Sequence, residues 1–378
     1  MNIATESLNL HKKLRGKLEI KSKQKITNKK ILSLLYTPGV AAASSAIAKN
    51  PKLAADLTVK NNMVAVISDG SAVLGLGNIG PLAALPVMEG KAVLFKEFAN
   101  VDAFPVCLNT QDTEEIISII KNIAPSFGGI NLEDIAAPRC FEIEKRLIAE
   151  LNIPVLHDDQ RGTATVVLAA LINALKIKKV SWEKAKIVVN GAGAAGTAIA
   201  NFLYQYGAKK IIVCDSRGVL NKSRADLNFE KSKLANRLLE EFQNLNSLEE
   251  ALQQADVFIG VSKGNLLKAD MVKSMNKDPI IFAMANPVPE IMPDVAKQAG
   301  AFIVATGRSD FPNQINNVLA FPGIFRGALD NKVKEITDTM LIRSAKNLAT
   351  CVKHPTTEKI IPSPFDKTIV KAVAKAIR

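Results

Sequence analysis

Two pairs of adjacent carboxylates are the side chains best suited to chemistry in this chain of 378 residues. Glu133-Asp134 follows the apolar stretch GGINL, and Asp158-Asp159 follows IPVLH. Carboxylate oxygens are the ligands that Mg²⁺ and Mn²⁺ prefer, and such sites leave positions open for substrate oxygens. Simpler roles remain open at this point, because Asp158-Asp159 could cap the helix that follows and Glu133-Asp134 could occupy a solvated turn.

A glycine-rich motif beyond the second acid pair predicts a dinucleotide site. The expected strand KIVVN precedes the motif, an expected helix follows it, and the next expected strand ends at Asp215, 19 residues after the motif. This spacing is typical of folds in which the acid contacts the adenosine ribose and the pyrophosphate rests on the helix N-terminus. We predict that NAD or NADP is bound by Asp215 and by the motif residues Gly191, Ala192, Gly193, Ala194, Ala195 and Gly196.

The acid at the end of that strand favours NAD, because a carboxylate repels the 2′-phosphate of NADP. Arg217 lies two residues after Asp215 and could accommodate the phosphate, so both cofactors stay open. A second GxGxxG motif spans residues 75–80, but no acid closes the strand AFPVCLN that follows it. It predicts either a tight strand-to-helix turn or a backbone surface near the substrate.

Lys91 lies in a segment expected to be helical, PVMEGKAVLFKEFA. Its neighbours three and four residues away are Val87, Met88, Leu94 and Phe95, which would form an apolar face. Burial on such a face would lower the pKa of the lysine and make it a candidate general base. A lysine that extends its amine to solvent is the alternative.

Other candidate groups lie at turns. Tyr36 precedes the rigid turn Thr37-Pro38-Gly39, where a buried core tyrosine is the usual reading. Asn286 in ANPVPE, and Asn316 and Asn317 in NQINNVLAFPG, follow expected strands. Such positions line the ligand crevice of doubly wound sheets, although turn amides that face solvent are equally compatible with the pattern.

The order of expected elements indicates two α/β domains. Strands alternate with helices from residue 186 onward, which predicts a parallel, doubly wound Rossmann-type sheet. We place the boundary near residue 160, with a substrate and metal domain at 1–160 and an NAD(P)-binding domain at 161–378. The first thirty residues are expected to be irregular, and the C-terminal helices after residue 330 could pack back across the domains.

Charge and composition limit which other classes of protein this chain can belong to. The net charge of +13 partly reflects residues 11–30, which hold nine Lys or Arg and one Glu. A nucleic-acid arm is one interpretation, but the segment has no aromatic residues for base stacking, so a solvated basic face that steers anionic substrates is favoured. No signal peptide, CxxC pair or run of 18 apolar residues occurs. We therefore expect a cytoplasmic protein with no membrane span and no nucleic-acid partner.

Many longer motifs, in order, carry a family resemblance from about residue 30 to the C-terminus. They are YTPGVA, SDGSAVLGLGNIG, MEGKAVLFKEFA, GGINLEDIAAPRCFEIE, IPVLHDDQRGTA, VVNGAGAAG, ANPVPE, TGRSDFPNQINNVLAFPGIFRGALD and IIPSPFD. Together they resemble the malic enzymes, in particular the compact bacterial branch. The resemblance implies oxidative decarboxylation of L-malate to pyruvate with NAD or NADP, dependence on Mg²⁺ or Mn²⁺, and a homodimer.

The resemblance also implies roles for single residues. Tyr36 matches the general acid that protonates the enolpyruvate carbon, and Lys91 matches the general base toward the C2 hydroxyl. Asp158 matches an acid that supports the proton relay, whereas Asn286 and Asn317 match amides near the substrate and nicotinamide. The matches to the metal-binding carboxylates are Glu133, Asp134 and Asp159.

Two positions depart from the family pattern. Bacterial relatives usually have histidine where Arg161 stands, and the larger eukaryotic branch has arginine at the position of Ala72. Arg161 could in part replace that missing charge at the substrate. Two other functions stay open, a malolactic enzyme that yields lactate and a non-catalytic NAD- or nucleic-acid-binding regulator.

Overall fold

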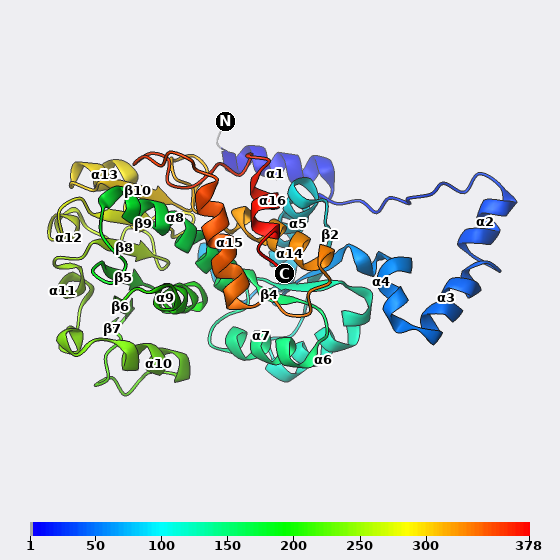
Figure 1. Cartoon of the computed structure of the whole chain (residues 1–378), viewed down its shortest axis with the longest axis horizontal. Helices are drawn as coiled ribbons and strands as arrows, with labels where there is room; N and C mark the ends of the chain where they lie inside the picture. Colours follow the sequence, from blue (N-terminus) through cyan, green and yellow to red (C-terminus); the bar gives the residue numbers. More distant parts are fainter. Residues whose placement is uncertain (1–2) are drawn as a thin grey trace.

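The computed structural model describes residues 3–378, which form two α/β bodies joined along one side by the C-terminal helices (Figure 1). The first body contains a parallel sheet in the order β2-β1-β3-β4. Its strands are β1 (Met63–Ser68), β2 (Asp102–Cys107), β3 (Gly129–Leu132) and β4 (Val155–His157). Because neighbouring strands are parallel, their carboxyl ends meet at one edge, where β3 leads into Glu133 and β4 into Asp158.

Both faces of the first sheet are covered by helices, as a parallel sheet requires. Along β1, Val64 and Val66 pack in the same cluster as Met88 and Phe95 of α5 (Gly80–Ala99). The alternate residues of β1 face α6 (Thr113–Ile123) and α7 (Arg139–Glu150) instead. The two-residue repeat of the strand therefore buries both of its faces.

The second body is a six-stranded sheet in the order β10-β9-β8-β5-β6-β7. All neighbours are parallel except β7, which runs antiparallel to β6. Its strands are β5 (Lys186–Asn190), β6 (Lys210–Asp215), β7 (Gly218–Val219), β8 (Val257–Gly260), β9 (Ile280–Ala283) and β10 (Ile303–Thr306). The predicted Rossmann-type doubly wound sheet is confirmed.

Helices cover both faces of this sheet as well. The long helix α8 (Thr163–Lys178), which is almost wholly buried, and α9 (Ala194–Tyr206) lie in the cluster that contains Ile187 and Val189 of β5. Val188, on the opposite face of the strand, packs in a cluster with residues of α11 (Leu248–Leu252), α12 (Ala269–Lys273) and α13 (Pro293–Gln298). The buried residues of α10 (Phe229–Arg237), Leu234 and Ala235, belong instead to the cluster of α8 and α9.

The C-terminal helices return to the first body, as the sequence suggested. They are α14 (Phe321–Asp330), α15 (Asp338–Thr350) and α16 (Ile369–Ala374). Phe321 and Phe325 of α14 pack edge-on against Phe95 of α5, with ring centroids 4.7 and 5.4 Å away. Edge-to-face aromatic pairs of this kind stabilise the contact beyond the area they bury. The last part of the chain thus connects the two sheets.

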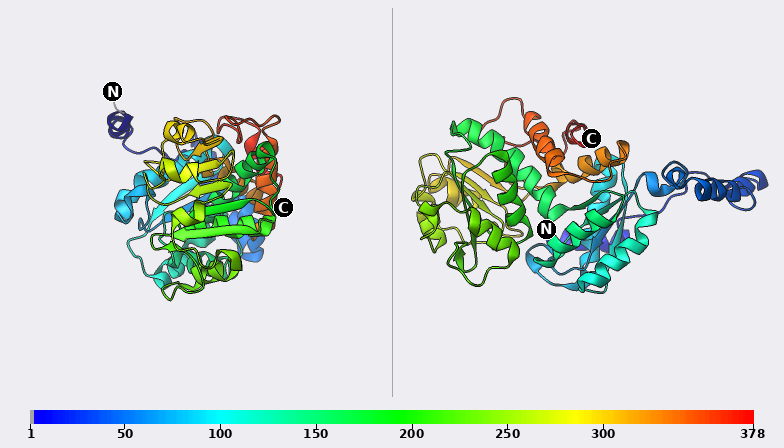
Figure 2. Two further views of the ribbon diagram at one scale, coloured as in Figure 1. Left: turned by 90° about the vertical axis from the view of Figure 1, so that its left-hand side faces the viewer. Right: turned by 60° about the horizontal axis from the view of Figure 1, so that its bottom comes forward.

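The N-terminal region differs from the sequence expectation. Residues 3–14 form a helix, α1 (Ile3–Leu14), so the prediction of an irregular start is wrong. The helix has no buried residue, and its large apolar side chains, Ile3, Leu8, Leu10 and Leu14, are each at least half exposed. After it, α2 (Lys29–Leu35) and α3 (Val40–Lys49) form an arm that extends away from the rest of the chain, with α4 (Ala54–Leu57) at its base (Figures 1 and 2).

Residues 29–49 of the arm are long and apolar enough, by length and composition alone, to cross a membrane, a feature that the sequence analysis did not identify. They form two helices of 7 and 10 residues separated by the turn at Thr37-Pro38. A membrane-spanning helix needs about 20 continuous residues, and neither helix reaches that length.

Candidate active site

One cleft of about 970 Å³ receives residues from both bodies and from the N-terminal segment. Lys91 from α5 and the acids that follow β3 and β4 lie on one wall, while the glycine-rich turn before α9 lies on the other. The predicted site residues that line the cleft are Lys91, Glu133, Asp134, Asp159, Gly193, Ala194, Ala195, Asn286 and Asn317. Residues that are distant in sequence are therefore gathered at the carboxyl edges of two parallel sheets.

Lys91 is the centre of the acidic wall. Its Nζ lies 2.6 Å from Oδ2 of Asp158 and 2.8 Å from Oε1 of Glu133, and all three side chains are nearly buried. The same amine lies 4.2 Å from the ring centroid of Phe321, a geometry that favours a cation. The sequence analysis missed Phe321, whose position beneath Lys91 depends on the return of α14.

The expected lowering of the Lys91 pKa is wrong. Burial alone would lower this pKa, but the negative charges of Asp158, Glu133 and Asp159 outweigh burial and raise it above its usual value. The amine is therefore held in its charged form by its neighbours. A base role for Lys91 needs a partner that can take its proton.

The neighbouring acids carry raised pKa values. Burial raises the pKa of Glu133 to about 7 and that of Asp158 to about 7, despite the opposing charge of Lys91. For Asp159, burial raises the pKa to about 6. Glu133 and Asp158 are buried and Asp159 is 32% exposed, so three acids share one amine, and a cation would offset the negative charge that they carry when ionised.

The donor set fits a hard divalent cation. The Asp134 amide donates to Oδ2 of Asp159 at 2.8 Å, which draws the two acid pairs together. Oδ1 of Asp158 is buried and has no hydrogen-bond partner within residues 3–378. In that range no three Asp, Glu, His or Cys side chains already converge closely enough to chelate an ion. The fit rests on the all-oxygen donors and on their uncompensated charge.

In the glycine motif of residues 191–196, two glycines are required by close contacts and a third leaves open space. A Cβ at Gly191, whose φ is +117°, would lie 2.6 Å from the carbonyl oxygen of Val261, and one at Gly196 would lie 1.6 Å from that of Gly191. A Cβ at Gly193 would meet nothing within 4 Å, and Gly193 lines the cleft. Gly191 and Gly196 thus permit the tight turn, while Gly193 leaves room for a pyrophosphate at the start of α9.

Asp215 ends β6 at the expected place, but its carboxylate is already paired. Arg224 contacts both of its oxygens, at 2.8 and 3.1 Å, and Nζ of Lys231 lies 2.7 Å from Oδ2. Hydrogen bonds from Arg224 and Lys231 outweigh burial and lower the Asp215 pKa. Arg217 turns to Asp226 and is mostly exposed. Local spacing gave no signal for Arg224, which lies in the loop after β7, or for Lys231, which lies in the first turn of α10.

The glycine motif of residues 75–80 also contributes to the cleft. Its Gly75 lines the cleft together with the nearby Ala72, and a Cβ at Gly75 would lie 2.0 Å from the backbone oxygen of Asn286. The loop from the first body therefore touches the loop after β9 of the second. Of the two interpretations given above, a backbone surface near the ligand is the one that this position favours.

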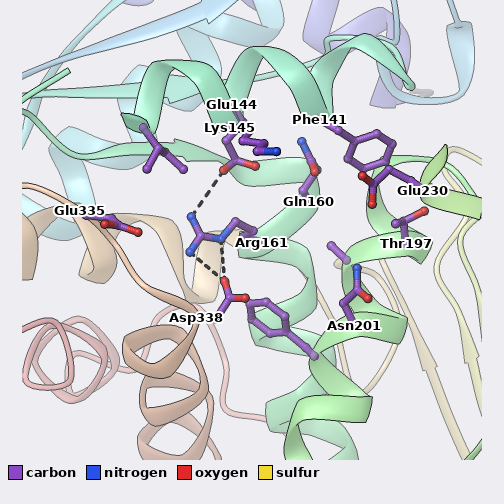
Figure 3. Close-up of a pocket in the computed structure, with 13 residues that line it drawn as sticks. Phe141, Glu144, Lys145, Gln160, Arg161, Thr197, Asn201, Glu230, Glu335 and Asp338 are labelled. Atoms are coloured by element: carbon purple, nitrogen blue, oxygen red, sulfur yellow. Dashed lines mark hydrogen bonds and ion pairs between the residues drawn. The ribbon is translucent and has the colours of Figure 1, made fainter. Parts of the chain in front are cut away.

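Two residues lie elsewhere in the described chain. Tyr36 is 68% exposed, at the turn between the two helices of the arm, and does not line the cleft. Arg161 is directed to Asp338 and Glu144 in a separate pocket (Figure 3), so it does not supply charge to the substrate as suggested above. The guanidinium is held in this pocket because it forms an ion pair with Asp338, the first residue of α15.

The cleft also contains two basic residues that were not predicted, His11 and Lys17. Nζ of Lys17 donates to the carbonyl of Pro86 at 2.6 Å, and burial lowers its pKa. Only the basic character of residues 11–30 hinted at this position. A half-buried amine in the lining of the cleft adds attraction for an anionic ligand when it is charged.

Comparison with known proteins agrees with this arrangement. The malic enzyme N-terminal domain matches residues 15–148, and the malic enzyme NAD-binding domain matches residues 160–377. This chain belongs to the malic enzyme family. In this malic enzyme family member, the first matched range holds Lys91, Glu133 and Asp134 of the cleft, and the second holds the glycine turn and Asn286.

Individual relatives support the same assignment. A bifunctional malic/malolactic enzyme from Bacillus subtilis is 55% identical over 100% of this chain and 92% of its own length. An NAD-dependent malic enzyme from Geobacillus stearothermophilus is 53% identical over 100% of this chain and 78% of its own length. The crystal structure of an NAD-dependent malic enzyme from Thermotoga maritima superposes with a TM-score of 0.95, at 52% identity over 98% of both chains.

Proposed function

We propose that this malic enzyme family member oxidises and decarboxylates L-malate to pyruvate and carbon dioxide, with reduction of NAD or NADP. The observation that carries the proposal is the Lys91, Asp158 and Glu133 cluster, which faces the glycine turn before α9 across one cleft. A hydroxy acid bound between these walls would have its C2 carbon near the nicotinamide and its hydroxyl near the amine.

Glu133, Asp134 and Asp159 would hold a divalent cation, Mg²⁺ or Mn²⁺. The ion would bind the oxygens of the substrate and draw electron density from the carbonyl as carbon dioxide leaves. Asn286 and Asn317, which line the opposite wall, would donate amide hydrogen bonds to the substrate or to the nicotinamide. These proposed roles go beyond family membership, because they assign a function to individual side chains.

Lys91 would take the proton of the C2 hydroxyl as hydride moves from C2 to the nicotinamide ring. Since its neighbours hold Lys91 charged, the amine must first pass a proton to Asp158, which lies 2.6 Å away. The Asp158 pKa of about 7 suits an acid that accepts and returns a proton near neutrality. The resulting β-keto acid loses carbon dioxide, and its enolate then needs a proton at C3.

We infer that Tyr36 of a second copy of the chain delivers that proton. The arm exposes Leu32, Leu34, Leu35, Tyr36 and Val40 by 40 to 68% each, and a surface of this kind is stable when another chain covers it. A two-fold dimer would place each arm against the other subunit. Tyr36 of one subunit would then lie in the cleft of the other subunit, which does not contain its own Tyr36.

Mixed dimers test this arrangement. Tyr36→Phe and Lys91→Ala should each be inactive alone. If each site combines Tyr36 of one subunit with Lys91 of the other, dimers re-formed from an equal mixture should recover about one quarter of wild-type activity. Mixtures that stay inactive, with re-formed dimers shown by light scattering, would refute the shared site.

A malolactic reaction is the second candidate, because the Bacillus subtilis relative is named for both activities. In that reaction the keto acid formed after decarboxylation is reduced to lactate before release, and no net reduced cofactor accumulates. Assays of pyruvate, lactate and reduced cofactor, with malate, Mn²⁺ and either NAD or NADP, separate the two. We expect pyruvate and reduced cofactor in equal amounts, and lactate without reduced cofactor would contradict this.

A further inference from the structure

Arg161 follows the acids Asp158 and Asp159 in one turn of chain, Asp158–Gly162, which joins β4 to α8. Asp159 lines the active-site cleft, whereas Arg161 lines a different pocket of about 380 Å³ between α7, α9 and α15 (Figure 3). The turn is tight, because a Cβ at Gly162 would lie 1.7 Å from Oδ1 of Asp158. A displacement at Arg161 would therefore be passed directly to the acids.

Two of the three guanidinium nitrogens of Arg161 donate to the C-terminal part of the chain. Its Nε and Nη2 donate to Oδ1 of Asp338 at 3.1 and 2.9 Å, and Nη2 also donates to the carbonyl of Ile336 at 2.5 Å. The side chain is 13% exposed. Asp338 begins α15 and also accepts from Gln205 of α9, so the contact reaches the helix that starts at the nucleotide turn.

Glu144 of α7 holds the other end of the same turn. Its Oε1 accepts from the backbone nitrogen of His157 at 2.7 Å and lies 3.7 Å from Nη1 of Arg161. His157 directly precedes the acid pair, and Arg161 follows it. The two acids are thus fixed from both sides by charge-assisted contacts, buried at His157 and partly buried at Arg161, which are stronger than neutral hydrogen bonds.

We propose that Arg161 is a positioning residue that holds the Asp158–Asp159 turn in register with the cofactor domain and so arranges the carboxylates for a divalent cation. This inference rests on the metal role proposed above. Residues that orient metal ligands typically change metal affinity by about 10–100-fold when they are replaced. Arg161 has this effect through Asp338, Ile336 and Glu144 rather than through any contact with substrate.

Binding of Mn²⁺ to the metal-free full-length enzyme, followed by the electron paramagnetic resonance of free Mn²⁺, tests the proposal. Arg161→Gln should raise the Kd for Mn²⁺ by about 10–100-fold, and Asp338→Asn should raise it less. Arg161→Lys should fall between Arg161→Gln and the wild type, because lysine keeps the charge but cannot form the planar two-point contact. Arg161→Gln and Asp338→Asn both break the contact between these two side chains. A variant that carries both substitutions should therefore bind Mn²⁺ no more weakly than Arg161→Gln alone.

Arg146→Gln is the matched control. Arg146 lies on α7 like Glu144, but its partners are Glu114, Glu142 and Glu150 on the surface, and none of its ion pairs involves the turn. It should keep the wild-type Kd. A wild-type Kd in Arg161→Gln would overturn the proposal, even with a lower Tm, because the contact would then serve stability alone.

If Arg161→Gln does not fold, Asp338→Asn provides the same comparison, since it weakens the contact and leaves the arginine in place. A wild-type Kd in Asp338→Asn would then overturn the proposal. Binding of Mn²⁺ to the wild-type enzyme separates a failure of the metal role from a failure of the role of Arg161. Should the wild-type enzyme itself bind no Mn²⁺, the metal role fails for every variant, whereas tight wild-type binding with no change in the variants refutes only the role of Arg161.

Discussion

Gly75→Ala should uncouple the two walls of the cleft without unfolding either body. A Cβ at Gly75 would lie 2.0 Å from the backbone oxygen of Asn286, and real Cβ contacts do not fall below 3.0 Å. The loop of the first body must therefore move away from the loop of the second by about 1 Å, the difference between these distances. Asn286 lies on the cofactor wall and Lys91 on the acidic wall, so this movement separates groups that must act together.

A displacement of about 1 Å can lower the rate of a reaction between held groups by about 10²-fold, which corresponds to about 2.7 kcal/mol. We expect kcat/KM for malate to fall by that factor in Gly75→Ala. The Tm should stay near that of the wild type, because the strain is relieved by loops at the cleft and not by the buried core. Steady-state kinetics, with a thermal melt of each sample, measures both quantities.

Gly90→Ala is the control for adding a methyl group to the lining of the same cleft without a collision between its two walls. Its Cβ would come no closer than 3.6 Å to any atom outside its own helix, and that atom is the flexible end of Lys17. Alanine also favours the helix by about 1 kcal/mol, so Gly90→Ala should keep more of its kcat/KM than Gly75→Ala and be slightly more stable than the wild type. If Gly75→Ala keeps kcat/KM within about twofold of the wild type, the two walls do not need the observed separation and the reasoning fails.

Three further outcomes follow from the charges at the site. Lys91→Ala should lower kcat by about 10²–10⁴-fold while circular dichroism stays native, and near-wild-type turnover would exclude its role as the base. Glu133 and Asp158 have pKa values of about 7 in the folded chain, above those of an unfolded acid, so they favour folding only while protonated and lose that contribution as the pH rises through 7. Mn²⁺ should therefore raise the Tm little at about pH 5 and much more at about pH 8, and equal shifts would contradict the proposed ligands. Asp215→Ser should free Arg224 for the 2′-phosphate and raise the ratio of kcat/KM for NADP to that for NAD, as separate assays with each cofactor would show.

Local sequence predicted most of the fold because its signals act over short distances. The strand before Gly191, the tight glycine turn and the acid at Asp215 follow from side-chain period and backbone sterics, and each was found where it was expected. The long buried helix α8 followed from its composition alone. The expectation of an irregular start was wrong for residues 3–14, which form α1, whereas residues 15–28 contain no helix or strand.

The sequence by itself determined which residue types were available and which elements would carry them, because helix and strand periods and turn chemistry are local properties. Only the tertiary structure decided the charge state of Lys91, the pairing of Asp215 with Arg224, and the direction of Arg161, since each depends on groups brought from distant parts of the chain. It also decided that Tyr36 lies away from the cleft of its own subunit. Electrostatic environment is set by distance in space, and spacing along the chain does not specify it.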